Sequence, residues 1–277
     1  MSNDTPRAAF SRKEWQKNTQ FHPLSESEVL RLVGEAVGQF KGLERPLVLL
    51  DLDSTLYEVG PRTLQIIQEW IPTYSHKLPF ELRMALETLP PEKVGYSLKD
   101  TLSNLGFPVV TEAMESLVQE MKSFWWDRFF SSDYLGYDRP YAGAVDYANW
   151  LYDLGAELCY LTGRSESRMR PGTEANLLRD GFPFHSEGTK LLMRQKEDWS
   201  DAAHKSHQVA QLLGDGVFVA SFENEPVNLV ALAQLIPKAA HIYVDTICSD
   251  HAAEPAKNIY TIKGFSSFRA PAEGIPQ

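Results

Sequence analysis

Two carboxylates, separated by one residue, follow an apolar run at residues 47–50. They are Asp51 and Asp53. An uninterrupted apolar run predicts a strand buried on both faces, as in a parallel sheet covered by helices. Buried carboxylates are costly unless something compensates their charge, and a divalent cation is the simplest compensation. Because residues i and i+2 of a strand point the same way, we expect both side chains to address one small site. That site would lie at the carboxyl edge of the sheet, where open α/β sheets bind ligands.

A second interpretation gives this stretch no catalytic or metal-binding role. A strand followed by an acidic turn would have the same residues, and short motifs recur by chance. The rest of the chain has to supply further residues at the same edge of the sheet before Asp51 and Asp53 indicate a site.

Composition narrows the classes of protein. The chain has 277 residues, of which 43% are apolar and 23% charged, which is typical of a folded globular protein with one large domain or a core plus a subdomain. The net charge of −10 argues against a nucleic-acid backbone as the main partner, but not against a small anionic substrate. The two cysteines, Cys159 and Cys248, form no C-x-x-C or Cys/His cluster. Neither a zinc site nor a disulfide framework is therefore expected.

The chain shows no targeting pattern. Its first residues lack a basic segment followed by an apolar one, and no apolar run is long enough to span a bilayer. We expect a cytoplasmic protein without a membrane anchor, and the sequence does not specify its oligomeric state. Residues 1–24 are polar and are expected to form an irregular surface tail.

The apolar pattern divides the chain into two parts. From residue 57 to about residue 138 it is helical, with stripes such as Leu64, Ile67 and Ile71, and no second strong strand. Residues 57–138 are therefore expected to form a helical subdomain inserted after the first strand. The core domain would then consist of residues 1–56 and 139–277.

Alternating strands and helices follow the insert. Short apolar runs predict strands at residues 158–161, 190–193, 217–222 and 241–244. Helices are expected between them, including a short one at 173–179 and one carrying Val209, Leu212 and Leu213. This alternation predicts an α/β fold with a doubly wound, Rossmann-like parallel sheet.

Polar residues suited to phosphate and metal chemistry follow three of these strands. They are Asp51 with Asp53, Thr162 with Gly163, and Glu223; Lys205 lies near the start of the helix before the fourth strand. In this order they resemble the haloacid dehalogenase-like (HAD) superfamily of aspartate-nucleophile hydrolases, over roughly residues 46–246. The helical insert falls where part of that family places a helical cap.

The resemblance implies a Mg²⁺-dependent phosphatase acting on a small phosphorylated molecule. Asp51 would be the nucleophile that attacks phosphorus and forms an aspartyl-phosphate. Asp53 would protonate the leaving oxygen and then activate water. Thr55 matches the same motif in a supporting role.

The resemblance also implies the binding residues. Thr162, Gly163 and Lys205 would hold the phosphoryl oxygens. The Mg²⁺ ligands would be Asp51, the backbone carbonyl of Asp53 and the carboxylate of Glu223. Lys190 is a rival for the phosphate-binding lysine, but it lies at the front of a strand, whereas Lys205 lies near a helix start that favours anions.

Some residues depart from the family pattern or carry no assigned role. Glu223 stands where aspartate is more frequent, Asn224 brings no charge, and Glu225 is a candidate second acid. Ser54 stands where glycine is common. The aromatic side chains near the end of the insert suit either a substrate pocket or the core of the subdomain: Trp125, Trp126, Phe129 and Phe130. None of the seven histidines has a visible catalytic or metal-ligand partner.

Two alternatives to the phosphatase stay open. A phosphomutase or other phosphotransferase of the same superfamily uses the same first motif. A non-catalytic phosphate-binding module could keep the fold, although the intact pair of Asp51 and Asp53 argues against it. Hydrolysis of an aryl phosphate with and without Mg²⁺ separates enzyme from binding module, and added phosphoryl acceptors separate transferase from hydrolase.

Overall fold

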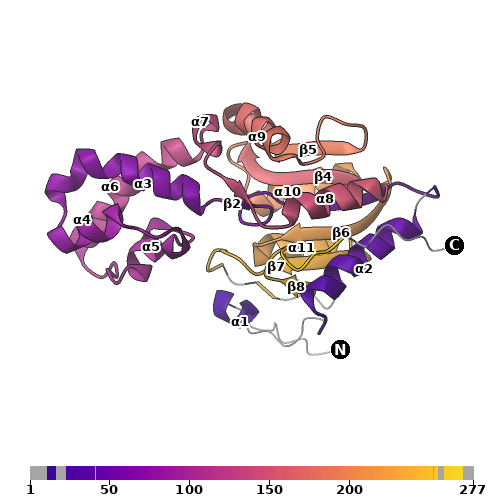
Figure 1. The fold of residues 1–277 in the computed structure, drawn as a ribbon, viewed down its shortest axis with the longest axis horizontal. Helices are drawn as coiled ribbons and strands as arrows, with labels where there is room; N and C mark the ends of the chain where they lie inside the picture. The colour runs from indigo at the N-terminus through magenta and orange to yellow at the C-terminus, as the bar shows by residue number, and fades with distance from the viewer. Residues whose placement is uncertain (1–10, 17–22, 41, 252, 255–258, 271–277) are drawn as a thin grey trace, which may run out of the picture.

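The computed structural model describes residues 11–16, 23–40, 42–251, 253–254 and 259–270. It consists of a sheet lobe and a helical lobe, which lie side by side in Figure 1. The helical lobe is formed by the helices between residues 60 and 129, and the sheet lobe by the remaining described elements, including the short helix Ser132–Leu135. The chain passes from the sheet lobe into the helical lobe and returns.

A six-stranded parallel sheet forms the centre of the sheet lobe, in the order β5-β4-β1-β6-β7-β8. Each predicted strand lies within one of its members, and β8 is a strand that the sequence did not predict. The strands are β1 (Pro46–Leu50), β4 (Glu157–Ser165), β5 (Thr189–Arg194), β6 (Val217–Glu223), β7 (Ala240–Val244) and β8 (Ile259–Ile262).

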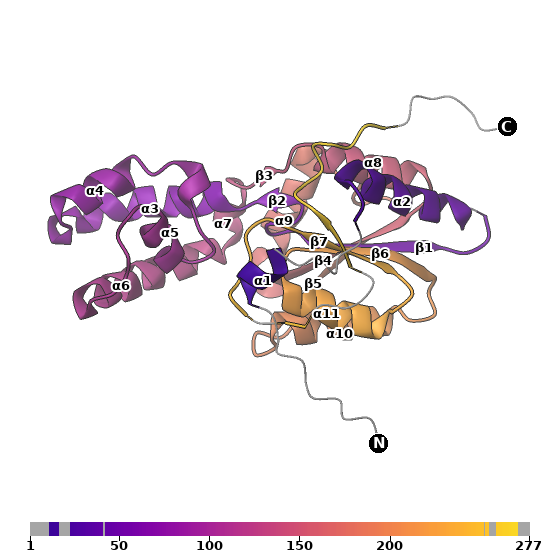
Figure 2. The same cartoon turned by 90° about the horizontal axis from the view of Figure 1, so that it is seen from below.

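Helices cover both faces of this sheet, as Figure 2 shows. Side chains alternate along β1, so that Val48 and Leu50 pack in one apolar cluster and Leu47 and Leu49 in another. The predicted α/β class with a doubly wound parallel sheet is therefore confirmed. The first cluster lies under α2 (Glu26–Gln39), α8 (Ala144–Asp153) and α9 (Glu166–Asp180), and the second under α10 (Asp201–Gln211) and α11 (Pro226–Leu235).

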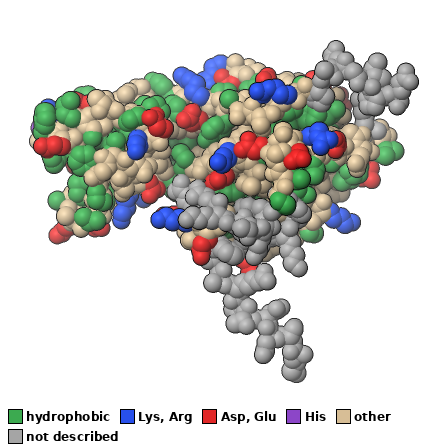
Figure 3. Space-filling view, turned by 60° about the horizontal axis from the view of Figure 1, so that its bottom comes forward, with side chains coloured by type: hydrophobic (Ala, Val, Ile, Leu, Met, Phe, Trp, Pro, Cys, Tyr) green, Lys and Arg blue, Asp and Glu red, His purple; other side chains and the backbone are tan. Residues whose placement is uncertain are grey.

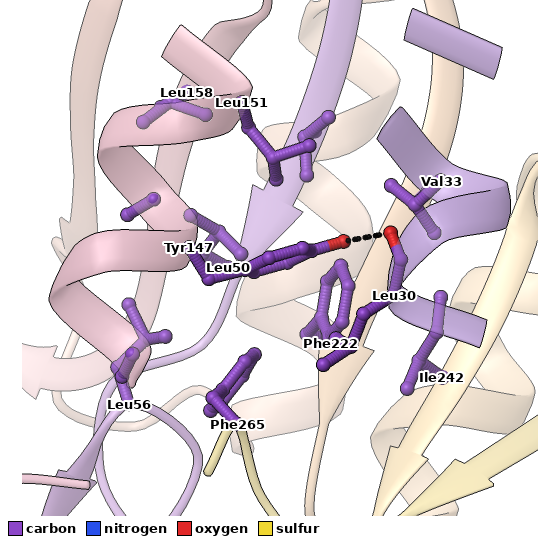
Figure 4. Close-up of a cluster of buried hydrophobic side chains, with 14 of the residues drawn as sticks. Leu30, Val33, Leu50, Leu56, Tyr147, Leu151, Leu158, Phe222, Ile242 and Phe265 are labelled. Carbon is purple, nitrogen blue, oxygen red and sulfur yellow. Dashed lines mark hydrogen bonds between the residues drawn. The ribbon is translucent and has the colours of Figure 1, made fainter. Parts of the chain in front are cut away.

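A buried tyrosine joins two of these helices (Figure 4). The Tyr147 hydroxyl on α8 donates a hydrogen bond of 3.1 Å to the carbonyl of Leu30 on α2. Its ring lies 5.6 Å from that of Phe222 and 5.5 Å from that of Phe265, measured between ring centroids. The phenol is thus buried without losing its hydrogen bond, which keeps its desolvation cost low.

The helical lobe has a hydrophobic cluster of its own. Its buried members, from Ile67 to Met121, all come from the helical lobe. A two-stranded antiparallel ribbon, β2 (Tyr57–Glu58) and β3 (Arg139–Pro140), lies where the chain enters and leaves the lobe. The elements of the lobe are α3 (Gly60–Tyr74), α4 (Phe80–Glu87), α5 (Leu98–Asn104) and α6 (Glu112–Phe129), with 3₁₀ helices at Ser75–Lys77 and Pro91–Lys93. The short helix α7 (Ser132–Leu135) packs on α9 of the sheet lobe, where Asn176 Nδ2 donates to the Leu135 carbonyl at 2.7 Å.

Two segments differ from the sequence expectations. The helix expected at 173–179 is longer, because Ser165 accepts a hydrogen bond from the Arg168 amide and α9 begins at Glu166. Within the expected irregular tail, Arg12–Gln16 form α1, and the fully buried Trp15 donates from Nε1 to the Ala253 carbonyl at 2.7 Å. The tail residues 1–10 and 17–22 lie outside the described residues.

The surface carries mixed charge. On the face shown in Figure 3, basic and acidic side chains are interspersed over both lobes. Of the helices in the described part of the chain, none combines the length and the apolar character needed to cross a membrane.

Candidate active site

A buried lysine joins two carboxylates at the carboxyl edge of the sheet. Asp51 follows β1 directly and Glu223 ends β6, so that the parallel pairing of these neighbouring strands brings both to the same edge. Lys205 on α10 places its Nζ 2.7 Å from Asp51 Oδ1 and 2.7 Å from Glu223 Oε2. All three residues are at least 95% buried. The lysine thus offsets part of a buried negative charge.

The site as a whole remains short of positive charge. Burial raises the pKa of Asp51 to about 6 and that of Glu223 to about 8, and the Lys205 ammonium only partly opposes this. Burial by itself would lower the pKa of Lys205, but the carboxylates of Asp201, Asp51 and Glu223 hold it well above its usual value. Additional positive charge would therefore stabilise the ionised carboxylates.

The side chain of Asp53 has different partners from that of Asp51. Arg164 donates from Nε to Asp53 Oδ2 at 2.9 Å and from Nη2 to Oδ1 at 2.8 Å, and Arg62 donates from Nη2 to Oδ1 at 2.6 Å. Asp138 accepts hydrogen bonds of 2.8 Å from both arginines. We call these four residues, Asp53, Arg62, Asp138 and Arg164, the charge cluster.

Asp51 and Asp53 therefore have different ion-pair partners, although the charge of Asp53 still contributes to raising the pKa of Asp51. The strand ends at Leu50, so the alternation of a strand does not determine the directions of the side chains that follow it. Burial would raise the pKa of the Asp53 carboxyl, but Arg164 and Arg62 outweigh burial and hold that pKa well below its usual range. In this arrangement Asp53 is a carboxylate.

The loop after Thr162 is fitted closely against the start of α10. Thr162 is fully buried, and its carbonyl lies 3.1 Å from His204 Nε2. A Cβ on Gly163 would lie 2.3 Å from Asp201 Oδ1, so only glycine fits without a shift of that carboxylate. Asp201 Oδ2 in turn lies 3.3 Å from Lys205 Nζ and accepts from Asn228 Nδ2 at 2.6 Å. The structure therefore brings Thr162, Gly163 and Lys205 to one place.

Hydrogen bonds of Thr55, Asn224 and Glu225 connect the loops that follow β1, β6 and β7. The Thr55 hydroxyl donates to Asn224 Oδ1 at 3.1 Å, and Asn224 Nδ2 donates to the Ile247 carbonyl at 2.6 Å. The Glu225 carboxylate accepts from the Ser249 amide at 2.8 Å and from its hydroxyl at 2.7 Å. Asn224 thus has a structural role, and Glu225 is directed toward the loop that follows β7.

Lys190 lies at the opposite edge of the sheet. Its Nζ is 2.6 Å from Glu157 Oε1 and 3.6 Å from Asp215 Oδ2. Glu157 begins β4 and is paired with Leu47, near the start of β1, whereas Asp51 follows the end of that strand. Of the two candidate lysines, it is Lys205 that contacts Asp51.

The aromatic residues at the end of α6 pack mainly on one another. The Trp125 and Phe129 rings stack at 4.2 Å, and those of Trp126 and Phe130 lie 4.5 Å apart. The Phe129 ring also lies 4.1 Å from the Arg62 guanidinium carbon, next to the charge cluster. These residues therefore connect the helical lobe with the junction between the lobes.

The donor chemistry fits a hard cation at Asp51 and Glu223. Both offer oxygen atoms, and burial of two carboxylates against one ammonium leaves surplus negative charge, as their raised pKa values indicate. Within the described ranges, no three side chains of His, Cys, Asp or Glu form a group that could hold a metal ion. A Mg²⁺ site here would therefore also need backbone carbonyls and water, as Mg²⁺ commonly does.

Four charged residues of this region received no role from the sequence: Arg62, Asp138, Arg164 and Asp201. Arg62 had a signal, because it is a charged residue on the helical stripe that continues with Ile66 and Trp70. Asp138 and Asp201 carried no such signal, since each lies in a segment of ordinary polar composition.

Residues 112–221 match the family model described as HAD superfamily, subfamily IIIB (acid phosphatase). The predicted resemblance to the HAD superfamily is confirmed. The match also supports the expected enzyme class, a hydrolase of phosphate monoesters. The matched range includes Thr162, Gly163 and Lys205, whereas Asp51 and Glu223 lie outside it. No curated protein matches the chain in sequence.

Solved structures with a similar architecture have low sequence identity to this chain. A haloacid dehalogenase-like hydrolase from Streptococcus pneumoniae is 12% identical over 78% of this chain and 93% of that chain, with a TM-score of 0.42. Protein tyrosine kinase A from Mycobacterium tuberculosis is 17% identical over 79% and 94%, with a TM-score of 0.47. A predicted phosphoglycolate phosphatase from Haemophilus somnus is 14% identical over 80% and 95%, with a TM-score of 0.45. Likeness at this level carries no argument about the reaction of this chain.

Proposed function

We propose that the protein is a Mg²⁺-dependent phosphatase that hydrolyses a small phosphate monoester through an aspartyl-phosphate at Asp51. The observation that carries this proposal is the contact of Lys205 with both Asp51 and Glu223 at the carboxyl edge of the sheet. A nucleophilic carboxylate, a second carboxylate for a cation and an ammonium for the phosphoryl group are the parts that phosphoryl transfer to an aspartate requires.

The residues of the chain would act in sequence. Asp51 attacks phosphorus, while Lys205, Thr162 and the backbone at Gly163 bind the phosphoryl oxygens. Asp53 protonates the leaving oxygen and then takes a proton from the water that cleaves the aspartyl-phosphate. Mg²⁺, held by Asp51, Glu223 and the Asp53 carbonyl, would supply charge neutralisation of the phosphoryl oxygens.

Asp53 must rearrange to do this. Its two carboxylate oxygens accept from Arg164 and Arg62, so proton donation requires that one of these contacts be exchanged for the leaving oxygen. Arg62 belongs to α3 of the helical lobe. We propose that residues 57–138 form a cap subdomain and that its movement relative to the core, residues 1–56 and 139–277, accompanies this exchange.

The proposal is tested by hydrolysis of 4-nitrophenyl phosphate with and without Mg²⁺. Asp51→Asn should abolish turnover, and Glu223→Ala should raise the Mg²⁺ concentration needed for half-maximal rate. Asp215→Asn removes a carboxylate at the opposite edge of the sheet. It should leave the turnover rate and the Mg²⁺ concentration for half-maximal rate unchanged. Substantial activity of purified Asp51→Asn protein, or an unchanged metal titration for Glu223→Ala, would contradict the assigned roles.

A further inference from the structure

The two oxygens of the Glu223 carboxylate are each held by a different partner. Glu223 Oε2 accepts from Lys205 Nζ at 2.7 Å, and Oε1 accepts from the backbone amide of Glu225 at 3.0 Å. A glutamate side chain has one more rotatable bond than an aspartate, so its carboxylate needs more support to stay in one position. The Glu225 amide supplies that support from within the same loop, and it brings no charge.

The peptide that carries this amide is fixed by the side chain of its own residue. Glu225 Oε1 accepts from the Ser249 amide at 2.8 Å, and Oε2 accepts from the Ser249 hydroxyl at 2.7 Å. With both oxygens bound to one residue, the side chain of Glu225 holds the loop after β6 against the loop after β7. A shift of Ser249 would therefore be transmitted to the amide that donates to Glu223.

The loop that carries Ser249 is itself attached to the core. Ser249 is only 3% exposed. On one side of it, the Thr246 hydroxyl donates to the Ser54 carbonyl in the loop after β1. On the other side, the Ala253 carbonyl accepts from Trp15 Nε1 at 2.7 Å. Ser249 is therefore a fixed point against which the Glu225 side chain is held.

These contacts favour a supporting role for Glu225 over direct metal binding. Each of its carboxylate oxygens already accepts from Ser249, whereas Glu223 contacts Lys205, which also contacts Asp51. In the part of the chain that the structure describes, Glu225 does not join Asp51 and Glu223 in a group of three acidic side chains that could hold a metal ion. The contribution of Glu225 to the site is its backbone amide.

We propose that Glu225 and Ser249 are positioning residues of the Mg²⁺ site, which together fix the amide that holds the Glu223 carboxylate in place for the cation. The inference rests on the proposed function and adds two residues to the metal site that it assigns. Hydrogen bonds to a ligating carboxylate fix its orientation, so their loss weakens metal binding although the ligand itself is unchanged. Mg²⁺ is sensitive to such a loss, because it demands near-ideal octahedral geometry.

The test measures Mg²⁺ binding without substrate, from the rise in the midpoint temperature of unfolding over a Mg²⁺ titration. Glu225→Ala and Glu225→Gln remove the same charge, but only glutamine keeps an oxygen that can accept from the Ser249 amide. We expect the Kd for Mg²⁺ to be about tenfold higher in Glu225→Ala than in Glu225→Gln. Ser249→Ala changes no charge and should raise the Kd several-fold. Ser221→Ala, which removes another buried serine hydroxyl, 2.8 Å from His241 Nδ1, should leave the Kd unchanged.

Activity separates positioning from a general loss of structure. In Glu225→Ala, the Mg²⁺ concentration for half-maximal hydrolysis of 4-nitrophenyl phosphate should rise, while kcat at saturating Mg²⁺ should stay within about twofold of the Glu225→Gln value. Equal Kd values for Glu225→Ala and Glu225→Gln, or a Ser249→Ala Kd equal to that of wild type, would overturn the inference.

The two proposals fail in different ways. A wild-type protein that binds Mg²⁺ but hydrolyses no phosphate ester would contradict the phosphatase function alone, since the comparison of Kd values uses no substrate. A wild-type protein whose unfolding temperature does not respond to Mg²⁺ would contradict both the metal site and the positioning roles of Glu225 and Ser249.

Discussion

Replacing Arg62 by methionine should be among the most destabilising single changes in this chain. Arg62 is fully buried and makes four hydrogen bonds through its guanidinium: two of 2.8 Å to Asp138, one of 2.6 Å to Asp53 and one of 2.9 Å to the Phe129 carbonyl. Methionine fills much of the same volume but supplies neither the charge nor the donors.

The size of the expected loss in stability follows from the buried carboxylate of Asp138, which the substitution deprives of one partner. Asp138 is fully buried and would keep one arginine contact, the 2.8 Å bond from Arg164 Nη2. Removing one partner of a buried ion pair typically costs about 3–5 kcal/mol, because the remaining charge stays desolvated. We expect Arg62→Met to lower the free energy of unfolding by about this amount.

A second substitution separates the charge effect from lost packing. Asp138→Asn in the Arg62→Met background removes the uncompensated carboxylate while keeping its shape, and should recover about 1–3 kcal/mol. Arg31→Met is the matched control, because Arg31 pairs with Glu35 at the surface and both side chains are more than half exposed. The Arg31→Met substitution should lower the free energy of unfolding by less than about 1 kcal/mol.

The assay is urea unfolding at neutral pH, followed by both circular dichroism and tryptophan fluorescence. Two probes are needed because the two lobes have separate hydrophobic clusters and need not unfold together. An Arg62→Met protein within about 1 kcal/mol of wild type would refute the assigned energetics of the charge cluster. So would a double mutant whose loss of stability equals the sum of the two single losses.

Three further predictions concern other parts of the chain. Lys205→Ala should lower kcat/KM by roughly a hundredfold, about 3 kcal/mol of transition-state stabilisation, whereas Lys190→Ala should change it much less; steady-state kinetics with one ester would expose the reverse ranking. Because Ser54 has a φ of +61°, Ser54→Gly should raise the unfolding free energy by up to about 1 kcal/mol and Ser54→Val should lower it, so changes of the same sign would argue against backbone strain. Burial lowers the pKa of His241 from 6.5 to about 4, so its neutral ring favours the folded state above pH 6.5 and this contribution is lost as the pH falls toward 4. The loss amounts to about 3 kcal/mol of unfolding free energy. In His241→Gln, the unfolding free energy should depend less on pH over this range, as measured by denaturant titrations at several pH values.

The strands and their order along the chain could be predicted because each one is specified by residues that are adjacent in the sequence. Buried parallel strands are short apolar runs, and the residues that follow them in the sequence meet at one edge of the sheet. For this reason Asp51, Thr162 and Glu223 could be placed at that edge, and Lys205 could be chosen over Lys190 from its position near a helix start. These predictions needed only the residue types in a short stretch of sequence around each strand or helix start.

The charge cluster could not be predicted because its members are far apart in the sequence. Arg62 and Asp138 lie at the two ends of the helical lobe, and they meet only because the chain returns beside its entry point. Asp53 lies beyond the end of β1 at Leu50, so the alternation of a strand does not determine which residues its side chain contacts. Trp15 likewise occupies a core position through contacts with residues late in the chain.

The most direct test of the proposed function is to trap the phosphorylated residue. Wild-type enzyme is mixed with 4-nitrophenyl phosphate and Mg²⁺, quenched in acid during turnover, reduced with borohydride and analysed by mass spectrometry of its peptides. An acyl-phosphate at Asp51 is reduced to homoserine at that position, and we predict this change in the presence of substrate and not in its absence. Turnover accompanied by an unmodified Asp51, or by modification at a different residue, would contradict the assignment of Asp51 as the nucleophile.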